Sequence, residues 1–352
     1  MMEAELPQSS EPAPEPFEFT GTGGDYFRIW IVNIALTIVT LGIYSAWAKV
    51  RRLQYFYRNT RVAGSSFDYH GRPVAILKGR LIAFGLIFVY NVAGRIDYRW
   101  AIAVAIPIAI ALPWMLRQSL RFRLHYSSWR GLRFGFRGAM RGAYAVFMLW
   151  PILTGLTLLA LGPLWHQRLK RYQHDNSVFG TTPFRISARV GDFYGIYGRA
   201  LAVMVALGAL GGITVFVLTL GAMRDGRGSA FAILLPFAFT IAFIGFFLLV
   251  GPYLFARIQN LVWNHTTLGP HRFRSTLRAR RLAWISFTNM LLIVVTLGLY
   301  MPFAAVRLAR YRVACMSLLP DTLLDEFVAG EQANVAAVGE ELGEFLDIDL
   351  AL

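Results

Sequence analysis

The sequence is poor in charged residues and in cysteine. Charged residues are 16% of the 352 residues, whereas about a quarter is usual in soluble domains, and 56% of the residues are hydrophobic. The single cysteine, Cys315, excludes an intrachain disulfide and a metal site built from several thiolates. The acidic, proline-rich N-terminal stretch lacks the basic start and apolar run of a secretory signal, so none is expected there. This composition favours a membrane protein.

Basic residues are missing from both ends of the chain. All 35 Lys and Arg lie between Arg28 and Arg312. Most of the 20 acids lie outside that span, and those within it are Asp68, Asp97, Asp175, Asp192 and Asp225. A body this basic needs an anionic neighbour, for which phospholipid headgroups and nucleic acid are the usual candidates.

Charge-free apolar stretches recur along the chain. They cover residues 29–48, 81–94, 100–116, 142–167, 200–223, 228–256 and 282–306. A helix crosses about 30 Å of hydrocarbon with roughly 20 residues, and most of these stretches are long enough. No Asp or Glu lies inside them. Proton- and cation-coupled transporters usually place a carboxylate in the membrane, so that mechanism is disfavoured, while passage of an anion or a lipid stays open.

The chain also resembles itself. Residues 33–57 (NIALTIVTLGIYSAWAKVRRLQYFY) are similar to residues 289–312 (NMLLIVVTLGLYMPFAAVRLARYR), and residues 160–172 hold a weaker copy. Four polar pieces, each with glycine and alternating aromatic residues, follow basic stretches at 59–71, 126–138, 176–187 and 264–276. Alternation with a period of two is typical of strands, so these pieces predict short hairpins.

The sequence therefore predicts an all-α polytopic membrane protein. We expect two three-helix repeats plus a final helix, with short β-hairpins at the cytoplasmic face. The predicted divisions are an acidic, proline-rich tail with a short strand (1–26), membrane repeat 1 (27–141), membrane repeat 2 (142–281), a final membrane helix with its basic flank (282–316) and an acidic C-terminal tail (317–352).

Two topologies stay open at this point. In the first, all seven apolar segments cross the membrane, and the basic connections are divided between its two sides. In the second, segments 29–48, 142–167 and 282–306 enter and return on one side, with breaks at Gly42, at Gly162 and Pro163, and at Gly298 and Pro302. The second leaves only Arg95, Arg99, Arg224 and Arg227 on the other side, as the positive-inside rule prefers. Segment length favours the first, since each of the three can span.

Basic residues interleaved with aromatic ones are the strongest local signal. One interpretation is positive-inside flanks with an aromatic belt, and the other is headgroup binding in pockets between helices. The candidates for binding a lipid or anion headgroup are Lys49, Arg51, Arg52, Arg58, Arg121, Arg123, Arg168, Lys170, Arg171, Arg307 and Arg310. Polar candidates inside apolar segments are Asn33, Asn91 and Asn289, which suit hydrogen bonds between helices or, alternatively, substrate contacts.

Other chemistries find no support in the residue pattern. The six His lie at connections without ligand spacing, so no metal site and no cofactor is predicted. Scattered Ser and His form no nucleophile motif, so we do not expect an enzyme. Nucleic acid is not an expected partner, because these basic residues lie at the bilayer plane. The acidic tail is either disordered or, as we prefer, docks on the basic cytoplasmic layer of the same chain.

Long stretches of the chain resemble a known family. They are FEFTGTGGDYFRIWIVN at 17–33, TLGIYSAWAKVRRLQYFYRNT at 40–60, FDYHGRPVAILKGR at 67–80, NLVWNHTTLGPHRFRS at 260–275 and the ending GEELGEFLDIDL. These are similar to the YjgN-like family of bacterial inner-membrane proteins, a domain of unknown function (DUF898). The resemblance implies a multi-pass protein of the bacterial inner membrane. It implies no activity, substrate or catalytic residue.

Two functional hypotheses follow. The first is a non-enzymatic membrane protein that binds anionic phospholipid or organises the membrane. The second is a transporter or channel for an anionic or amphipathic solute, with its site at the repeat interface near Asn33 and Asn289. The oligomeric state stays open.

Overall fold

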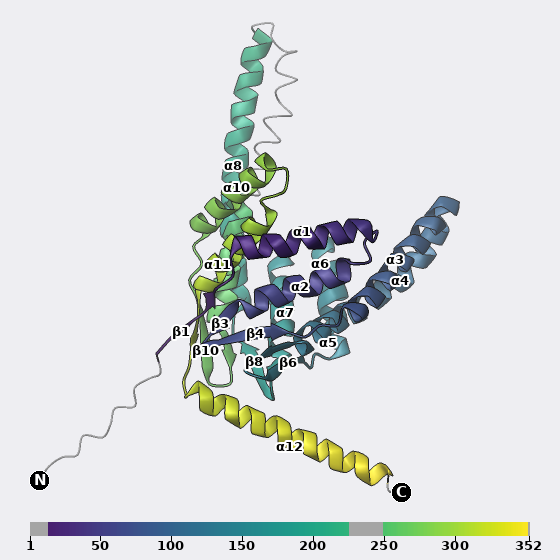
Figure 1. The fold of residues 1–352 in the computed structure, drawn as a ribbon. Coiled ribbons are helices and arrows are strands. Elements are labelled where there is room, and N and C mark those ends of the chain that lie inside the picture. Colours follow the sequence, from purple (N-terminus) through teal and green to yellow (C-terminus); the bar gives the residue numbers. More distant parts are fainter. Residues whose placement is uncertain (1–12, 225–248, 351–352) are drawn as a thin grey trace, which may run out of the picture.

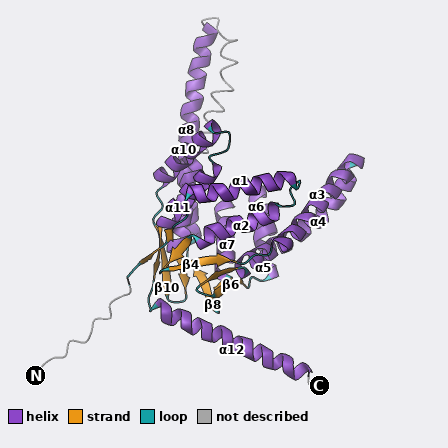
Figure 2. Ribbon diagram, viewed as in Figure 1, coloured by secondary structure: helices purple, strands orange, loops and turns teal. Residues whose placement is uncertain are grey.

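A computed structural model describes residues 13–224 and 249–350, without the side chains of 210, 218, 222–223 and 338–350. Helices surround one 11-stranded antiparallel sheet (Figures 1 and 2). The strands are β1 (Glu15–Pro16), β2 (Glu18–Phe19), β3 (Thr60–Val62), β4 (Ser65–Tyr69), β5 (Ser127–Trp129), β6 (Leu132–Phe136), β7 (Ser177–Phe179), β8 (Thr182–Ile186), β9 (Thr266–Leu268), β10 (His271–Ser275) and β11 (Met316–Leu319). Their order is β1-β11-β10-β9-β8-β7-β6-β5-β4-β3-β2.

The two strands at the ends of this order, β1 and β2, are neighbours in the sequence. β1 and β2 are separated only by Phe17, yet β1 pairs with β11 and β2 pairs with β3. The Phe17 N–H donates to the carbonyl of Met316 at 3.0 Å, and the Thr20 N–H donates to the carbonyl of Asn59 at 2.9 Å. One short N-terminal segment therefore joins the first and last hairpin strands and closes the sheet into a ring, which we call the closed sheet.

Each hairpin is preceded and followed by a helix. The leading helices are α2 (Ser45–Arg58), α4 (Tyr98–His125), α7 (Gly162–Asp175), a helix over residues 249–264 and α11 (Met301–Ala314). The following helices are α3 (Pro73–Ile96), α5 (Met140–Tyr144), α8 (Val190–Arg224), α10 (Ala279–Val295) and, after β2, α1 (Gly23–Val39). The π-helix η1 (Ala145–Leu149) and α6 (Trp150–Leu156) continue α5. The closed sheet thus contains four helix–hairpin–helix units and a fifth unit, in which α11 and β11 combine with β1, β2 and α1 from the N-terminal end.

Two-residue turns set the register of the hairpins. Ala63–Gly64 and Arg130–Gly131 have positive φ at both positions, 47° and 72° in the first pair and 47° and 80° in the second. This is the backbone of type I′ turns, whose twist matches that of paired strands. Gly180 and Gly269 take positive φ at the first turn position only, as type II′ turns require.

The interior of the closed sheet is aromatic. The third residue of β4, β6, β8 and β10 is phenylalanine, and Phe17 takes the same place between β1 and β2. These rings stack in sequence around the interior, with centroid separations of 6.2 Å (Phe17–Phe67), 6.3 Å (Phe67–Phe134), 6.4 Å (Phe134–Phe184) and 6.1 Å (Phe184–Phe273). We call these five residues the phenylalanine ring. Val62, Trp129, Phe179, Leu268 and Leu318 form a second, buried layer nearer the hairpin turns.

Three helices within the described ranges are long and apolar enough to cross a membrane. They are Pro73–Ile96, Tyr98–His125 and Val190–Gly221. The pair α3–α4 projects from the body and α8 rises above it (Figure 1). The predicted segment 228–256 lies mostly outside the described residues.

None of the three repeat-leading segments is a single continuous helix. α1 and α2, α6 and α7, and α10 and α11 are joined by tight turns at residues 40–44, 157–161 and 296–300. Leu41 and Gly42 have φ of 48° and 92°, and Leu297 and Gly298 have φ of 50° and 94°. Of the two topologies left open by the sequence, these turns favour the one in which the segments return. All hairpins belong to one hydrogen-bonded sheet, so they lie on one side of the membrane.

The predicted all-α fold with two three-helix repeats and a final helix is wrong. The closed sheet draws strands from the N-terminal tail, from both predicted repeats and from residues 316–319. Hairpins do form at the four predicted places, but they pair with one another rather than lying separately. The pairing escapes sequence analysis because strands of two to five residues carry no signal for their partners.

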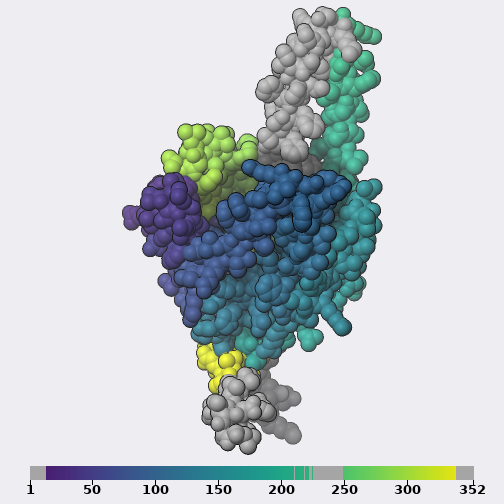
Figure 3. Space-filling model, turned by 90° about the vertical axis from the view of Figure 1, so that its right-hand side faces the viewer, coloured from purple at the N-terminus to yellow at the C-terminus, as the bar shows by residue number. Residues whose placement is uncertain are grey.

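The C-terminal helix α12 (Leu324–Leu350) lies across the end of the sheet that holds the hairpin turns (Figures 1 and 3). Phe327 packs 6.3 Å from the ring of Phe179 and 4.5 Å from that of His271, and Val328 is buried in the same cluster. Asp325 forms an ion pair with Arg130. These contacts close the turn end of the sheet, while docking of the acidic tail on the whole basic layer stays a prediction.

Glu331 anchors α12. Its carboxylate accepts hydrogen bonds from the backbone N–H of Thr181 at 2.6 Å and of Thr182 at 3.2 Å, and from both threonine hydroxyls. Burial alone raises the pKa of Glu331, but these hydrogen bonds outweigh it and lower the pKa. Because the pKa is lower when α12 is docked, the stabilisation is complete above the ordinary glutamate range and is lost as pH falls through the docked pKa.

We expect Glu331→Ala to release the first turns of α12. Removing the acceptor leaves the two N–H groups of the turn unpaired, at a cost of about 1–3 kcal/mol. Hydrogen–deuterium exchange of residues 324–335 should accelerate in the variant, and acidification should loosen the wild-type helix but not the variant further. Glu326→Ala is the control, since that side chain is exposed. Equal exchange in both variants contradicts an anchoring role.

Candidate anion-binding site

A cavity of about 750 Å³ lies where the leading helices meet the sheet. Its walls come from α4, α7, α8, α11 and the helix over residues 249–264. The polar lining consists of Arg123, His166, Lys170, Gln173, His174, Ser177, Tyr197, Gln259 and Arg312. No Asp or Glu is among the described residues that line it. We call this cavity the basic chamber.

Equivalent helix positions bring the basic side chains together. Arg123, Gln173 and Arg312 each lie three residues before the residue that precedes a hairpin strand. Lys170 and Gln259 lie one helical turn earlier. Residues three or four apart lie on the same face of a helix. Each leading helix therefore presents the side chains of both positions toward the other leading helices. The fivefold arrangement therefore concentrates side chains that are distant in sequence.

The electrostatics of the basic chamber are unbalanced. Burial, and then the charge of Arg123, lower the pKa of Lys170. Burial lowers the pKa of Arg312, and burial followed by the charges of Arg80 and Arg123 lowers that of Lys49. Each shift means that the surroundings disfavour the charged form. A bound anion would remove this penalty, since an opposite charge within a few ångströms favours the protonated state.

The carboxylates of the described residues do not neutralise the chamber. The ion pairs are Arg58–Asp68, His70–Asp68, Arg130–Asp325 and Arg171–Asp175, and none of their members lines the cavity. Arg312 instead lies over the ring of Phe255, with 4.5 Å between its guanidinium carbon and the ring centroid. A cation–π contact orients the guanidinium without cancelling its charge, so its N–H donors stay available.

Two histidines of α7 add neutral polar groups. Burial, and secondarily the charge of Lys170, lower the pKa of His166 and of His174 to about 4. Both rings are thus neutral at physiological pH. His166 Nδ1 hydrogen-bonds the hydroxyl of Tyr197 at 2.7 Å, and His174 Nδ1 lies 3.4 Å from the hydroxyl of Thr266. The positive charge of the chamber therefore comes from its Lys and Arg.

Only some of the predicted headgroup residues reach the basic chamber. Arg123 and Lys170 line it, and Lys49 lies near enough to interact with Arg123. Arg312 and Gln259 also line it but were not among the predicted headgroup residues. Arg312 could have been found from its position, which matches that of Arg123 relative to the following hairpin strand.

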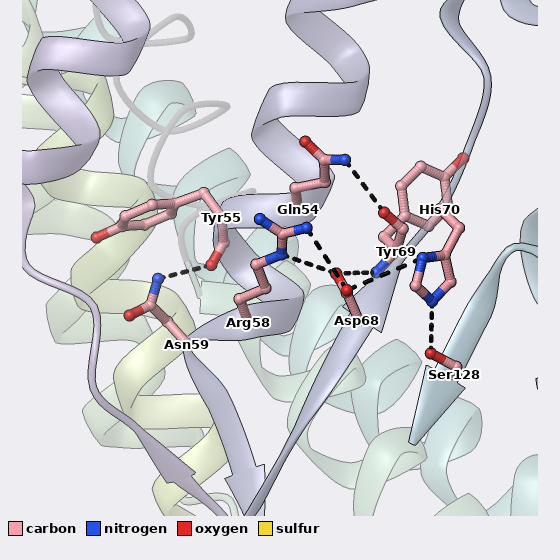
Figure 4. A network of polar contacts seen from close by, with 8 residues as sticks. All are labelled: Gln54, Tyr55, Arg58, Asn59, Asp68, Tyr69, His70 and Ser128. Carbon is pink, nitrogen blue, oxygen red and sulfur yellow. Dashed lines mark hydrogen bonds and ion pairs between the residues drawn. The ribbon is translucent and has the colours of Figure 1, made fainter. Parts of the chain in front are cut away.

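Other predicted residues make contacts within the body. Arg58 forms a 2.8 Å ion pair with Asp68, in a network that continues to His70 and Ser128 (Figure 4). Burial raises the pKa of Asp68, but the hydrogen bond and charge of Arg58 outweigh it and lower the pKa. Arg171 pairs with Asp175, Arg307 donates to Thr288 and Asn289, and Arg310 donates to the carbonyl of Gly21.

The remaining predicted arginines lie outside the chamber. Arg51 lies over the ring of Tyr44 at 5.7 Å, and Arg168 lies over that of Trp150 at 5.9 Å. Arg52 is exposed, and Arg121 lines a separate cavity beside β6. Their part in headgroup binding stays a prediction.

The three asparagines occupy different surroundings. Asn289 is buried, donates to the carbonyl of Ala304 at 3.3 Å and accepts from Arg307, and so links α10 to α11. Asn33 is buried on α1, with no partner for its side-chain oxygen among the described residues. Asn91 is exposed and donates to the carbonyl of Ile87. None of them lines the basic chamber.

An apolar groove of about 1040 Å³ adjoins the basic chamber. It runs between α6–α7 and α8, and it shares His166, Tyr197, Gly251 and Leu254 with the chamber. Leu158 and Leu159, at its outer end, are 91% and 72% exposed. Leucines with this exposure are typical of residues that face hydrocarbon. The groove therefore extends from the basic chamber to the part of the surface that these leucines form. We call it the lateral groove.

The polar lining of the basic chamber suits an oxyanion. Within the described residues, no group of three or more His, Cys, Asp and Glu side chains could hold a metal ion. The chamber offers ammonium, guanidinium, amide and hydroxyl donors, which bind oxyanions.

The comparisons with known proteins agree with this membrane setting. The family model described as "Bacterial protein of unknown function (DUF898)" matches residues 14–345. The chain belongs to this family. It is 26% identical to inner membrane protein YjgN of Salmonella typhimurium over 342 residues, covering 83% of this chain and 85% of the relative. It is 33% identical to inner membrane protein YjgN of Escherichia coli O157:H7 over 147 residues, covering 40% of this chain and 35% of the relative.

With its apolar helices, this DUF898 chain is a multi-pass protein of the bacterial inner membrane. The family is of unknown function, and these relatives carry no enzymatic name. No solved structure matches the chain.

Proposed function

We propose that this inner-membrane protein binds the anionic headgroup of a phospholipid in the basic chamber, without catalysing a reaction on it. The observation that carries the proposal is the convergence of Arg123, Lys170 and Arg312 on one cavity whose described lining holds no carboxylate. Lys170 and Arg312 are partly desolvated, and a desolvated cation without a counter-ion costs free energy in the absence of a ligand. A phosphate diester recovers that free energy through charge-assisted hydrogen bonds.

The lateral groove supports a lipid rather than a free anion. A headgroup in the chamber leaves the acyl chains of its lipid beside the residues shared by the two cavities, and the apolar groove begins there. A water-soluble phosphate has no apolar part that could bind in this groove. The ligand class is therefore an anionic phospholipid, which reaches the chamber from the bilayer.

Transport of an anionic amphiphile is the second candidate. It shares the chamber and the groove, but it also needs a path to the other side of the membrane. The closed sheet and α12 lie across one end of the molecule, so retention of the lipid is favoured over its passage. We also favour a binding function over a catalytic one, since the described lining of the chamber offers oxyanion donors and its two neutral histidines already contact the hydroxyls of Tyr197 and Thr266.

The experiment compares retained lipid by native mass spectrometry. Protein delipidated in mild detergent is titrated with phosphatidylglycerol or phosphatidylcholine. We expect phosphatidylglycerol to bind more tightly, and the double variant Arg123→Gln, Lys170→Gln to lose about tenfold or more in affinity, because each charge-assisted hydrogen bond contributes about 1.5–3 kcal/mol.

The matched control removes two exposed positive charges on the sheet, through Arg185→Gln and Arg272→Gln. It keeps the net charge of the test variant and leaves the chamber lining intact. Equal losses in the two double variants would mean that surface charge alone holds the lipid. Equal affinity for the two lipids in the wild-type protein would also overturn the proposal.

A further inference from the structure

Another cavity, of about 550 Å³, lies inside the closed sheet. Its walls are the phenylalanine ring, the second layer formed by Val62, Trp129, Phe179, Leu268 and Leu318, and the ends of α2, α11 and the helix over residues 249–264. We call it the aromatic cavity. Its volume and its mainly aromatic lining with few polar groups are typical of sites for small ligands.

The number of strands explains why this space is not filled by side chains. Eight strands enclose an interior that side chains just fill, and a larger closed sheet leaves room inside. Three members of the phenylalanine ring, Phe17, Phe67 and Phe134, are only half-buried although they point into the sheet. Part of the surface of each ring is therefore free to contact a ligand.

The aromatic cavity has one closed end and one open end. At the turn end, Phe327 and Val328 of α12 pack on the second layer. At the other end, the cavity shares Phe134, Phe184, Gln259, Trp263 and Arg312 with the basic chamber. Arg312 is the cation common to both linings, so a positive charge stands where the apolar space begins.

We infer that the aromatic cavity holds one hydrocarbon chain of an amphiphile whose anionic group lies at Arg312 in the basic chamber. The inference rests on the proposed function and adds where part of the ligand goes: one chain enters the sheet instead of staying in the lateral groove. The aromatic faces provide the apolar contact, and the mouth at Arg312 and Gln259 admits a chain whose anionic end stays outside. A phospholipid or a single-chain fatty acid has this chemistry.

The test uses Trp129, which lines the aromatic cavity but not the basic chamber. A long-chain fatty acid and a phosphatidylglycerol, each brominated near the chain end, are added to the full-length protein in detergent. Bromine quenches tryptophan fluorescence at short range. We expect quenching in the wild-type protein. In Trp129→Phe, the quenching should be smaller by the contribution of Trp129. Quenching by both ligands assigns the cavity to hydrocarbon chains in general, and quenching by one alone identifies the source of the chain.

Blocking the cavity provides the second arm. Ala309 lines the aromatic cavity on α11, so Ala309→Phe should reduce quenching to the level of Trp129→Phe. Ala314→Phe is the matched control, because this alanine is on the same helix but exposed, and it should quench like the wild type. If Ala309→Phe fails to fold, the difference in quenching between the wild-type protein and Trp129→Phe still tests the inference.

The inference and the proposed function fail in different ways. Retention of phosphatidylglycerol that depends on Arg123 and Lys170, without quenching of Trp129, overturns the inference and leaves headgroup binding standing. If neither this retention of phosphatidylglycerol nor quenching of Trp129 is observed, the proposed function is overturned as well. Quenching that Ala309→Phe and Ala314→Phe leave unchanged overturns the inference, because the chain then reaches Trp129 from outside the cavity.

Discussion

Single cysteines at Ser66, Arg185 and Arg272 should all react with a membrane-impermeant maleimide from the cytoplasmic side and not from the periplasm. These positions are exposed on β4, β8 and β10 of one hydrogen-bonded sheet, which cannot be divided by a bilayer. The positive-inside rule places the basic hairpins in the cytoplasm. The readout is all-or-none labelling in spheroplasts against inverted vesicles, in a Cys315→Ala background.

The opposite pattern is expected at the far end of α3. A cysteine at Asp97, between two helices long enough to span, should react only from the periplasm. If all seven apolar segments crossed, Arg185 and Arg272 would react on the opposite side from Ser66. Periplasmic labelling at either position is therefore incompatible with the closed sheet and with the return of the three repeat-leading segments.

Phe179→Ala should destabilise the protein more than any exposed phenylalanine substitution. The side chain is 1% exposed, and its ring lies 5.7 Å from Trp129, 5.1 Å from Phe134 and 6.3 Å from Phe327. Truncating a buried phenylalanine costs about 3–5 kcal/mol through lost burial and the cavity left behind. The free energy of unfolding, measured by denaturant titration in detergent, should fall by that amount.

Phe84→Ala is the control for this loss. Phe84 is 68% exposed on α3, a helix predicted to face hydrocarbon, so its truncation should change the free energy of unfolding by no more than about 0.5 kcal/mol. Similar small changes in both variants would show that the second layer of the closed sheet is not a packed core. Phe179→Leu, which keeps most of the volume, should fall between the two.

Some of the architecture could be predicted because its cause is local. The hairpins depend on glycine-containing two-residue turns and on alternation over about five residues, as in Phe67 and Tyr69 of β4. The breaks at Gly42 and Gly298 likewise follow from φ values of 92° and 94°, which glycine tolerates. Each of these signals lies within a few neighbouring residues of the sequence.

The basic chamber could be predicted only in part. Arg123 and Lys170 were recognised by charge and aromatic neighbours, but so were Arg58, Arg171 and Arg307, which bind groups of the same chain. Sequence analysis cannot separate an arginine with a partner from one without, because the partner comes from another element. Asp68, for example, is ten residues from Arg58 and lies on β4, whereas Arg58 ends α2.

The sequence by itself determined the membrane setting, the basic body, the positions of the hairpins and the family. Each of these depends on composition or on neighbours along the chain. Only the tertiary structure decided that the hairpins join into a closed sheet, that three apolar segments return, and that Arg312 meets Arg123 and Lys170 at one cavity. The physical reason is that backbone pairing between very short strands carries no residue code, so its geometry exists only once all the hairpins are present.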